Sequence, residues 1–427
     1  MKPINQTIAH LKPSGIRKYF DLANSMEGVI SLGVGEPDFD TPWHISAKAV
    51  ESFEDGHTHY TANRGLIALR KQIAGYYHSR YGIDYDPQSE ILVTVGGSEA
   101  VDLCCRTLIS PGDEVIVSPI TFAASANCVR YCGATPVFAD IDPKTWNIDP
   151  ASIREKLTVK TKAIVAVDFG GVHVDSDEIR KICDENGLTF IEDAAHAMGT
   201  FHNGRAVGTI ADITTFSFHP VKTITTGEGG AVATNDPELG KMIELYAKHG
   251  ITRNHDLMRE TDQGGWYYEQ LVLGYNYRIS DIEASLGVSQ MKRLDQFGSR
   301  RKELVAFYNE QFSKIPEVQF QIDASPDDTV RHLYCLKFDT EALGVTRRWI
   351  FDALRAENLG VNVHYLPVYL LPYYKDLGRG DCPNAEDYYD RCVTLPLHCG
   401  LSNEDAQLVV DAVTKVVEWC RANRGAK

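Results

Sequence analysis

Two patterns of apolar residues divide the first two thirds of the chain into strands and helices. Short apolar runs, typical of buried strands, occur at 91–95, 114–117, 135–138, 162–168 and 188–192. Apolar residues recur at helical spacing over 66–81, 99–108, 121–131, 150–157 and 176–186. Strands that alternate with helices in this way predict an α/β fold with a mostly parallel sheet and helices on both faces.

The last third of the chain has a different pattern. A helix-start signature at Ser280–Glu283 precedes spaced apolar residues, which predict one long helix leaving the large domain. Strand-like segments at 332–338 and 361–365 alternate with helical ones at 346–358 and 402–422, where Ser402 and Asp405 fit a capping box. We therefore predict an N-terminal arm over 1–45, a large α/β domain over 46–300 and a small α+β domain over 301–427.

The stretch 216–231 combines a strand, a lysine and a glycine cluster. Alternation puts Phe216 and Phe218 on one face and Ser217 on the other, and a proline then ends the strand before Lys222. A lysine held between strand ends is poorly hydrated, which lowers its pKa. A neutral amine of this kind can bond covalently to a carbonyl compound or to pyridoxal 5′-phosphate (PLP). An ordinary loop lysine would explain Lys222 equally well if it stood alone.

Two further features fit a phosphate-bearing pyridine cofactor. Asp193 ends the apolar run 188–192, and α/β sheets bind ligands at the carboxyl ends of their strands. PLP requires an acid beside its ring nitrogen. The strand 91–95 enters Gly96–Ser98 and a helix, which creates an anion site of exposed N–H groups. A plain strand-to-helix turn is an equally good explanation of this last motif by itself.

The string I-E-D-A-A-H, followed by F-S-F-H-x-x-K-x-I-T-T-x-E-G-G-A-V, resembles the DegT/StrS family of PLP-dependent sugar aminotransferases. The resemblance runs from about residue 113 to the end and is strongest to enzymes that aminate carbon four of nucleotide-linked 4-keto sugars, as in the pseudaminic acid pathway. It implies a fold type I PLP enzyme. In such an enzyme Lys222 would bind the cofactor and shuttle the proton, Asp193 would hold the ring nitrogen, and Ser98 and Ser217 would bind the phosphate.

The same resemblance implies three further contacts with the cofactor. Phe122 would stack on the pyridine ring, His196 would contact the edge of the cofactor, and Asn276, in the motif G-Y-N-Y-R, would reach the phosphate of a partner subunit. Each residue also has a structural explanation. Phe122 would pack in the core, His196 would be a buried histidine with satisfied hydrogen bonds, and Asn276 would stabilise a turn.

Residues 14–112 resemble a second family, the class I or aspartate aminotransferase-like enzymes, through the motifs G-E-P-D-F-x-T-P, H-Y-T-x-x-x-G and G-G-S-E-A. This resemblance would put Gly35 near the substrate carboxylate and Tyr60 on the partner's phosphate. The cofactor's own phosphate would lie on the turn made by Gly97, Ser98, Glu99 and Ala100. The chain therefore resembles a hybrid with a seam near 112–118. Tyr60 and Asn276 would compete for one phosphate, so we expect one of them to be displaced.

Together these features predict a homodimeric aminotransferase that uses L-glutamate as the amino donor and a nucleotide-linked 4-keto-6-deoxy sugar as the acceptor. A class I amino acid aminotransferase is the first alternative, but its Ser-Lys pair, N-P-T-G turn and D-E-x-Y strand end are missing at the corresponding places. A PLP-binding regulatory or non-catalytic protein is the second, although no basic DNA-binding segment is present. A sugar dehydratase would carry histidine in place of Lys222.

Composition narrows the remaining choices. The net charge of −15 argues against nucleic acid or an anionic membrane as the main partner. No apolar run approaches the ~18 residues of a membrane span, and the polar start lacks a signal sequence. The ten cysteines form no regular framework, and Cys128 and Cys132 have no second pair that would complete a metal site. We therefore expect a cytoplasmic protein with reduced thiols and no metal.

Overall fold

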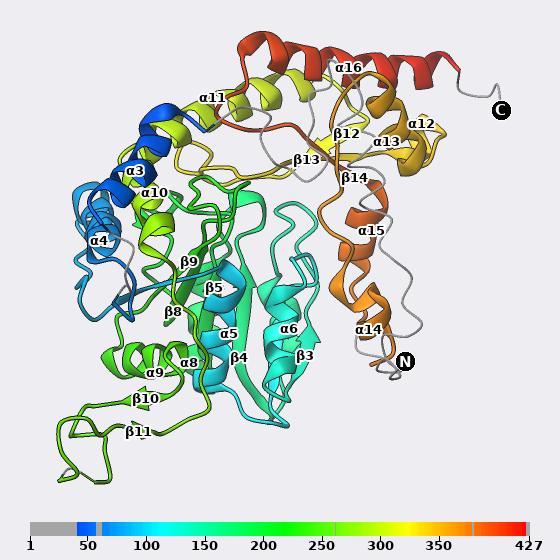
Figure 1. The fold of residues 1–427 in the computed structure, drawn as a ribbon. Coiled ribbons are helices and arrows are strands. Elements are labelled where there is room, and N and C mark those ends of the chain that lie inside the picture. The colour runs from blue at the N-terminus through cyan, green and yellow to red at the C-terminus, as the bar shows by residue number, and fades with distance from the viewer. Residues whose placement is uncertain (1–40, 57–61, 261, 378–379, 424–427) are drawn as a thin grey trace, which may run out of the picture.

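The computed structural model describes residues 41–56, 62–260, 262–377 and 380–423 (Figure 1). Most of the predicted arm, together with Gly35 and Tyr60, lies outside these residues. The first described helix, α3, runs from Trp43 to Glu54 and so crosses the predicted boundary at residue 45.

A seven-stranded sheet forms the centre of the large domain, in the order β1-β9-β8-β5-β4-β2-β3. The strands from β3 across to β8 are all parallel, whereas β9 is antiparallel to both β8 and β1. The prediction of a mostly parallel sheet is thus confirmed. The strands are β1 (Ile91–Thr94), β2 (Glu114–Val117), β3 (Thr135–Phe138), β4 (Thr161–Val167), β5 (Thr189–Asp193), β8 (Ile213–Ser217) and β9 (Gly230–Ala233).

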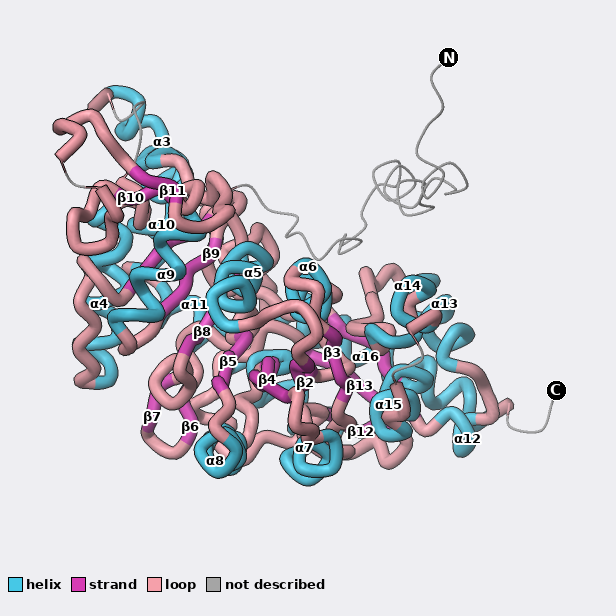
Figure 2. The backbone as a smooth tube through the Cα atoms, turned by 90° about the horizontal axis from the view of Figure 1, so that it is seen from below, coloured by secondary structure: helices cyan, strands magenta, loops and turns pink. Residues whose placement is uncertain are grey.

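Helices cover both faces of this sheet, as Figure 2 shows from below. On one face lie α5 (Gly97–Leu108) and α6 (Ala124–Tyr131), and on the other lie α7 (Pro150–Lys156) and α8 (Ser176–Asn186). Helices α4 (Ile67–Tyr81) and α9 (Pro237–Ala247) flank the β1 end. Two short hairpins, β6–β7 (Phe201–His202, Arg205–Ala206) and β10–β11 (Ile251–Thr252, Glu269–Gln270), project from the large domain.

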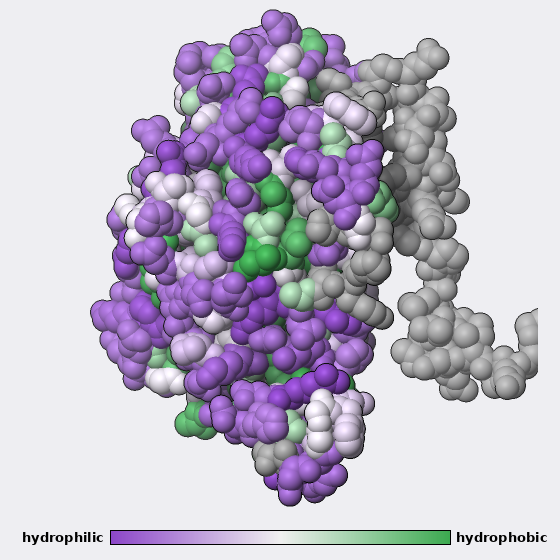
Figure 3. All heavy atoms as spheres, turned by 60° about the vertical axis from the view of Figure 1, so that its left-hand side comes forward, coloured by the Kyte–Doolittle hydropathy of each residue, from purple (hydrophilic) through white to green (hydrophobic). Residues whose placement is uncertain are grey.

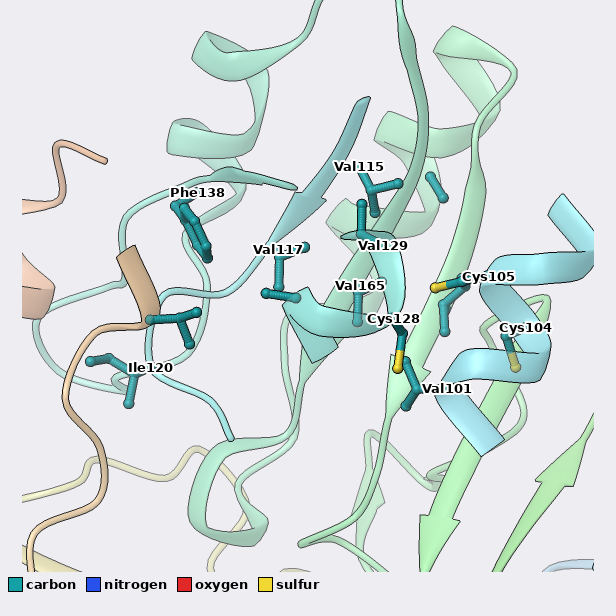
Figure 4. Close-up of a cluster of buried hydrophobic side chains, with 14 of the residues drawn as sticks. Val101, Cys104, Cys105, Val115, Val117, Ile120, Cys128, Val129, Phe138 and Val165 are labelled. Carbon is teal, nitrogen blue, oxygen red and sulfur yellow. The ribbon is translucent and has the colours of Figure 1, made fainter. Parts of the chain in front are cut away.

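The core between α5, α6 and the sheet explains several of the cysteines (Figure 4). Cys104, Cys105 and Cys128 are buried among valines of the helices and of β2 and β4, where they pack as small apolar side chains. All ten cysteines lie in the described part of the chain and all are free thiols, as expected.

The small domain packs helices against a three-stranded antiparallel sheet, β12-β13-β14. The predicted capping box is present, because the Ser402 and Asp405 side chains each accept a hydrogen bond from the other residue's backbone N–H. The elements are β12 (Val318–Phe320), β13 (Tyr334–Phe338), β14 (Cys392–Leu395), α12 (Thr340–Leu343), α13 (Arg347–Ala356), α14 (Pro372–Lys375), α15 (Pro383–Arg391) and α16 (Asn403–Ala422).

The predicted single long helix after Ser280 is wrong. The chain forms α10 (Asp281–Met291) and α11 (Leu294–Phe312), with a non-helical Arg293 between them. The break lets α10 pack on α3 and α4 while α11 packs on α16, a requirement of tertiary packing that no local residue signals. The predicted domain boundary at residue 300 falls inside α11. The predicted strand-like segment 361–365 forms only an isolated bridge, between Asn362 and Thr394.

Across the described residues, none of the helices has both the length and the apolar character needed to cross a membrane.

Candidate active site

A cavity of about 430 Å³ lies at the carboxyl ends of the central strands, between the large-domain sheet and the small domain. Most of the predicted site residues line it, although they come from four separate segments. They are Gly97, Ser98, Phe122, Asp193, His196, Ser217 and Lys222. Glu99, Ala100 and Asn276 do not line the cavity, and Tyr60 lies outside the described residues.

Lys222 reaches this cavity from the turn that follows β8. Phe216 and Phe218 are buried in the core, while Ser217 faces the cavity, so the predicted alternation is confirmed. The backbone N–H of Lys222 donates to the carbonyl of His219 at 2.9 Å, which fixes the turn. Burial lowers the pKa of Lys222 to about 8, and the negative charge of Asp193 partly opposes this shift. About a tenth of the amine is therefore neutral at pH 7, far more than for a lysine with an ordinary pKa.

Asp193, the last residue of β5, is buried and held by two hydrogen bonds. Its Oδ2 accepts from the Ser125 hydroxyl at 2.8 Å, and its Oδ1 accepts from the Ala195 N–H at 3.2 Å. Burial raises the pKa of Asp193, while these two bonds and the charge of Lys222 lower it. Ser125 in turn lies 2.8 Å from the Thr121 hydroxyl. The carboxylate is thus oriented by a chain of polar groups.

Backbone N–H groups open onto the cavity at the start of α5, where no side chain caps the helix. A Cβ on Gly97 would lie 2.8 Å from the Cβ of Ser217, and a Cβ on Gly230 would lie 2.6 Å from the Gly97 nitrogen. Only glycine at these two places lets the helix begin directly beside the ends of β8 and β9. The N-terminus of α5, with the hydroxyls of Ser98 and Ser217, forms a site suited to a phosphate.

Glu99 and Ala100 support this turn from behind. The Glu99 carboxylate accepts a hydrogen bond from the Val95 N–H at 3.2 Å, and the fully buried Ala100 donates its N–H to Gly96 O at 3.1 Å. Burial raises the pKa of Glu99 to about 7. The two side chains do not line the cavity, and the contact of this turn with the cofactor's phosphate remains a prediction.

His196 lies on an irregular turn after β5. Its Nδ1 accepts the Gly170 N–H at 3.3 Å, which leaves the ring proton on Nε2, 3.4 Å from the Tyr365 hydroxyl. Burial, Lys222 and His364 together hold the pKa of His196 well below its usual value, so the ring is neutral.

Phe122 and Asn276 occupy contrasting positions. The Phe122 side chain is 63% exposed on the cavity wall, so the core-packing explanation does not hold. Asn276 lies outside the cavity of its own chain, where its Oδ1 accepts from Arg278 Nε at 3.0 Å and its backbone pairs with Lys248. The predicted contact of Asn276 with the phosphate of a partner subunit remains a prediction.

Sequence reasoning missed the small-domain wall of the cavity. His332, His364, Tyr365 and Thr394 line it, yet they come from three distant segments that share no local pattern. His364 Nδ1 lies 2.9 Å from the Thr394 hydroxyl, and the ring centroids of His332 and His196 are 4.7 Å apart. Burial and Lys222 lower the pKa of His364 to about 4. This wall therefore offers neutral hydrogen-bonding groups.

Comparison with known proteins identifies a matching family. The sequence model of the DegT/DnrJ/EryC1/StrS aminotransferase family matches residues 84–414 of this chain. The match includes the Gly96–Ala100 turn, which lies upstream of the predicted seam near 112–118. The chain is 42% identical over 345 residues to the spore coat polysaccharide biosynthesis protein SpsC of Bacillus subtilis, which covers 78% of this chain and 88% of the relative. It is 36% identical over 308 residues to the UDP-4-amino-4,6-dideoxy-N-acetyl-β-L-altrosamine transaminase of Campylobacter jejuni. This match covers 71% of this chain and 79% of the relative.

Solved structures agree with this assignment and with the predicted fold. PseC of Helicobacter pylori, an aminotransferase of pseudoaminic acid biosynthesis, superposes with a TM-score of 0.77 at 28% identity, covering 90% of this chain and 98% of that one. The PLP form of the putative sugar aminotransferase Spr1654 of Streptococcus pneumoniae gives a TM-score of 0.77 at 28% identity. This superposition covers 89% of this chain and 97% of that one.

Proposed function

The chain belongs to the DegT/DnrJ/EryC1/StrS aminotransferase family, and from this premise we propose that it moves an amino group from L-glutamate to a nucleotide-linked 4-keto-6-deoxy sugar, with PLP as its cofactor. The observation that carries the proposal is the pair Lys222 and Asp193, which face one cavity from the ends of neighbouring strands. The Campylobacter relative transaminates a UDP-linked 4-amino-4,6-dideoxy sugar, which supports this acceptor class. The Bacillus relative supports a role in surface polysaccharide synthesis.

The described residues fit PLP at both of its charged ends. The open N-terminus of α5, with Ser98 and Ser217, would hold the phosphate, and Asp193 would hold a proton on the ring nitrogen. The exposed face of Phe122 would pack against the ring. When bound, PLP supplies an electron-poor ring that takes up the electrons released from the substrate carbon.

Lys222 is the proton carrier in this scheme. Its lowered pKa of about 8 leaves part of the amine neutral, so Nζ can take a proton from the substrate carbon and return it on the other side of the transfer. His196, which stays neutral, would donate its Nε2 proton toward the Tyr365 hydroxyl and fix that ring beside the cofactor.

The small-domain wall of the cavity favours a sugar as the amino acceptor. His332, His364, Tyr365 and Thr394 present neutral donors and acceptors, which suit hydroxyl groups. Among the described residues that line the cavity there is no arginine, the side chain best suited to a substrate carboxylate. The glutamate carboxylates would therefore need a cation from outside this set, and a partner subunit could supply it.

We propose that the active unit is a homodimer in which Asn276 reaches the phosphate site of the partner subunit. The β10–β11 hairpin and the segment after it expose Trp266 (77%) and Leu273 (80%), and apolar atoms also gather on the face over α3, α4 and α10 (Figures 1 and 3). Exposed apolar groups of this kind mark contact surfaces. A cytoplasmic location remains a prediction.

The test combines covalent labelling with single turnovers. The full-length protein, loaded with PLP and reduced with borohydride, should carry the cofactor on the peptide that contains Lys222. L-glutamate should convert the bound cofactor to its amine-bearing form, which a UDP-linked 4-keto-6-deoxy sugar should discharge faster than oxaloacetate or pyruvate. Labelling of another lysine would overturn the site, and preferential discharge by the 2-keto acids would overturn the sugar substrate.

A further inference from the structure

A second group of chemically active side chains lies next to Asp193, outside the cavity. Asp168 follows β4 directly, Glu192 precedes Asp193 in β5, and His173 lies on the loop between β4 and α8. Their ligand atoms lie within 4.8 Å of one another, and all three residues are buried. Because neighbouring residues of a strand point to opposite faces, Glu192 points away from the cavity that Asp193 faces. We call these residues the Asp168–His173–Glu192 cluster.

Each member of the cluster is fixed through one of its polar atoms. Asp168 Oδ1 accepts the Val174 N–H at 2.9 Å, and Glu192 Oε2 accepts from the Gly208 N–H at 2.8 Å and the Thr214 hydroxyl at 3.0 Å. Of the remaining atoms, His173 Nε2 and Glu192 Oε1 form an ion pair at 3.1 Å, whereas Asp168 Oδ2 makes no hydrogen bond. An unsatisfied buried carboxylate oxygen is costly, so Asp168 Oδ2 requires an explanation.

The histidine identifies the kind of occupant that would suit the cluster. His173 Nδ1 lies 2.5 Å from the Val174 carbonyl oxygen, so Nδ1 carries a proton and donates it. Against the effect of burial, Asp168 and Glu192 raise the pKa of His173 to about 9, so without a bound ion Nε2 holds a proton that faces Glu192 Oε1, 3.1 Å away. A divalent cation can replace this proton, because metal binding to a histidine releases the proton of the ligating nitrogen. A metal-binding histidine that gives its other N–H to a backbone carbonyl, beside carboxylates that are themselves hydrogen-bonded, is the usual arrangement around a bound metal.

We propose that the Asp168–His173–Glu192 cluster binds a divalent first-row transition metal of the Zn²⁺ or Mn²⁺ class. One imidazole and two carboxylates suit these ions better than Ca²⁺ or Mg²⁺, which prefer oxygen ligands alone. Ligands at about 2.0–2.2 Å in a tetrahedral set lie about 3.3 Å apart, close to the separation of His173 Nε2 and Glu192 Oε1. Two buried carboxylates would also balance the 2+ charge.

A route to the cluster and a consequence for the active site both follow from the structure. His173 lines a second cavity of about 640 Å³, where its ring stacks on His202 at 4.8 Å. The Asp168 N–H donates to the Asp193 carbonyl at 3.2 Å. A metal here would tie the ends of β4 and β5 together directly behind the carboxylate of Asp193, and would do so as a structural ion rather than by taking part in amino transfer.

The experiment uses the full chain without an affinity tag, stripped with a chelator and loaded with PLP so that the histidines of the cavity are covered. Co²⁺ titrated into this protein should bind at one ion per chain with visible d–d absorption and without the sulfur-to-cobalt charge transfer that cysteine ligands give. His173→Ala should abolish the band, whereas His364→Ala, a cavity histidine, and His78→Ala, an exposed histidine paired with Asp84, should retain it.

Zn²⁺ at about 100 times its dissociation constant should raise the Tm of the wild-type chain by about 3 °C and leave the His173→Ala variant unchanged. If that variant does not fold, anomalous scattering from a Zn²⁺-soaked wild-type crystal replaces it and should place the ion between Asp168, His173 and Glu192. Absence of one-to-one binding, binding that survives His173→Ala, or an anomalous peak elsewhere would overturn the proposal.

Discussion

At the residue scale, a few neighbouring groups influence the charge of Asp193. The first prediction concerns the substitution Asp193→Asn, which removes this charge and keeps the shape of the side chain. The Asp193→Asn variant should fold and still bind PLP. Its turnover should fall on the order of 10²-fold or more, a loss similar to that caused by removing other fixed electrostatic partners. The loss should affect both half-reactions, because each needs the ring nitrogen protonated. Stopped-flow absorbance with glutamate alone and with keto sugar alone measures them separately. Near-normal rates in both would show that another group protonates the ring.

The second prediction concerns the hydrogen bond between the Ser125 hydroxyl and Asp193 Oδ2. This bond lowers the pKa of Asp193, so Ser125→Ala should raise it. Because the carboxylate must be ionised, activity should be retained at high pH and lost earlier as the pH falls, and the acid limb of kcat/KM should move to higher pH. Ser289→Ala, whose hydroxyl bonds to His44 O away from the cavity, is the matched control. An unmoved acid limb would contradict this role of Ser125.

The individual residues of the site also show how much the sequence can predict. Lys222 and Asp193 could be found because Asp193 ends a strand and Lys222 lies on the turn after another, and the apolar pattern of both strands is local. His332, His364 and Thr394 could not, because only the packing of the small domain brings them to the cavity. The Asp168–His173–Glu192 cluster could likewise not be predicted, since its geometry depends on hydrogen bonds from Val174, Gly208 and Thr214.

At the scale of elements, the third prediction concerns the contact between α5 and β8. Gly97→Ala would place a Cβ 2.8 Å from the Cβ of Ser217, so the helix N-terminus must move away from the strand. We expect a loss of about 1–3 kcal/mol in the free energy of unfolding and a weaker affinity for PLP. Calorimetry and a PLP titration measure the two effects.

The matched control is Gly75→Ala, in the middle of α4, where an added Cβ meets nothing within 4 Å. It should leave PLP binding unchanged and stabilise the helix by roughly 0.5–1 kcal/mol. If both variants bind PLP as the wild type does, the close approach of α5 and β8 has no part in the phosphate site.

Helix starts were predicted correctly where the capping residues lie close together in the sequence. Ser280 with Glu283 and Ser402 with Asp405 both form the capping boxes that begin α10 and α16. The end of α10 at Met291 carries no such signal, because neither glycine nor proline is present and the break serves the packing of α10 and α11 on different partners. Helix starts were therefore easier to predict than this break.

At the scale of the whole molecule, the last prediction tests whether the site is shared between subunits. Asn276 does not line the cavity of its own chain, and we predict that it contacts the phosphate in a partner's cavity. Lys222→Ala and Asn276→Ala should each lower activity as pure dimers, the first by removing the proton carrier and the second by weakening PLP binding. Equal amounts of the two variants, unfolded together and refolded, will pair at random.

In a mixed dimer, the subunit that keeps Lys222 receives its Asn276 from the other subunit, so one of its two sites is intact and the other has both defects. Random pairing should then restore about one quarter of the wild-type sites, because half of the dimers are mixed and each has one intact site. Activity measured at limiting PLP should rise to that level, whereas variants refolded separately and then mixed should not recover. If Asn276 acted within its own chain, every site in the mixture would carry one defect and refolding together would restore nothing, so the shared site would have to be abandoned.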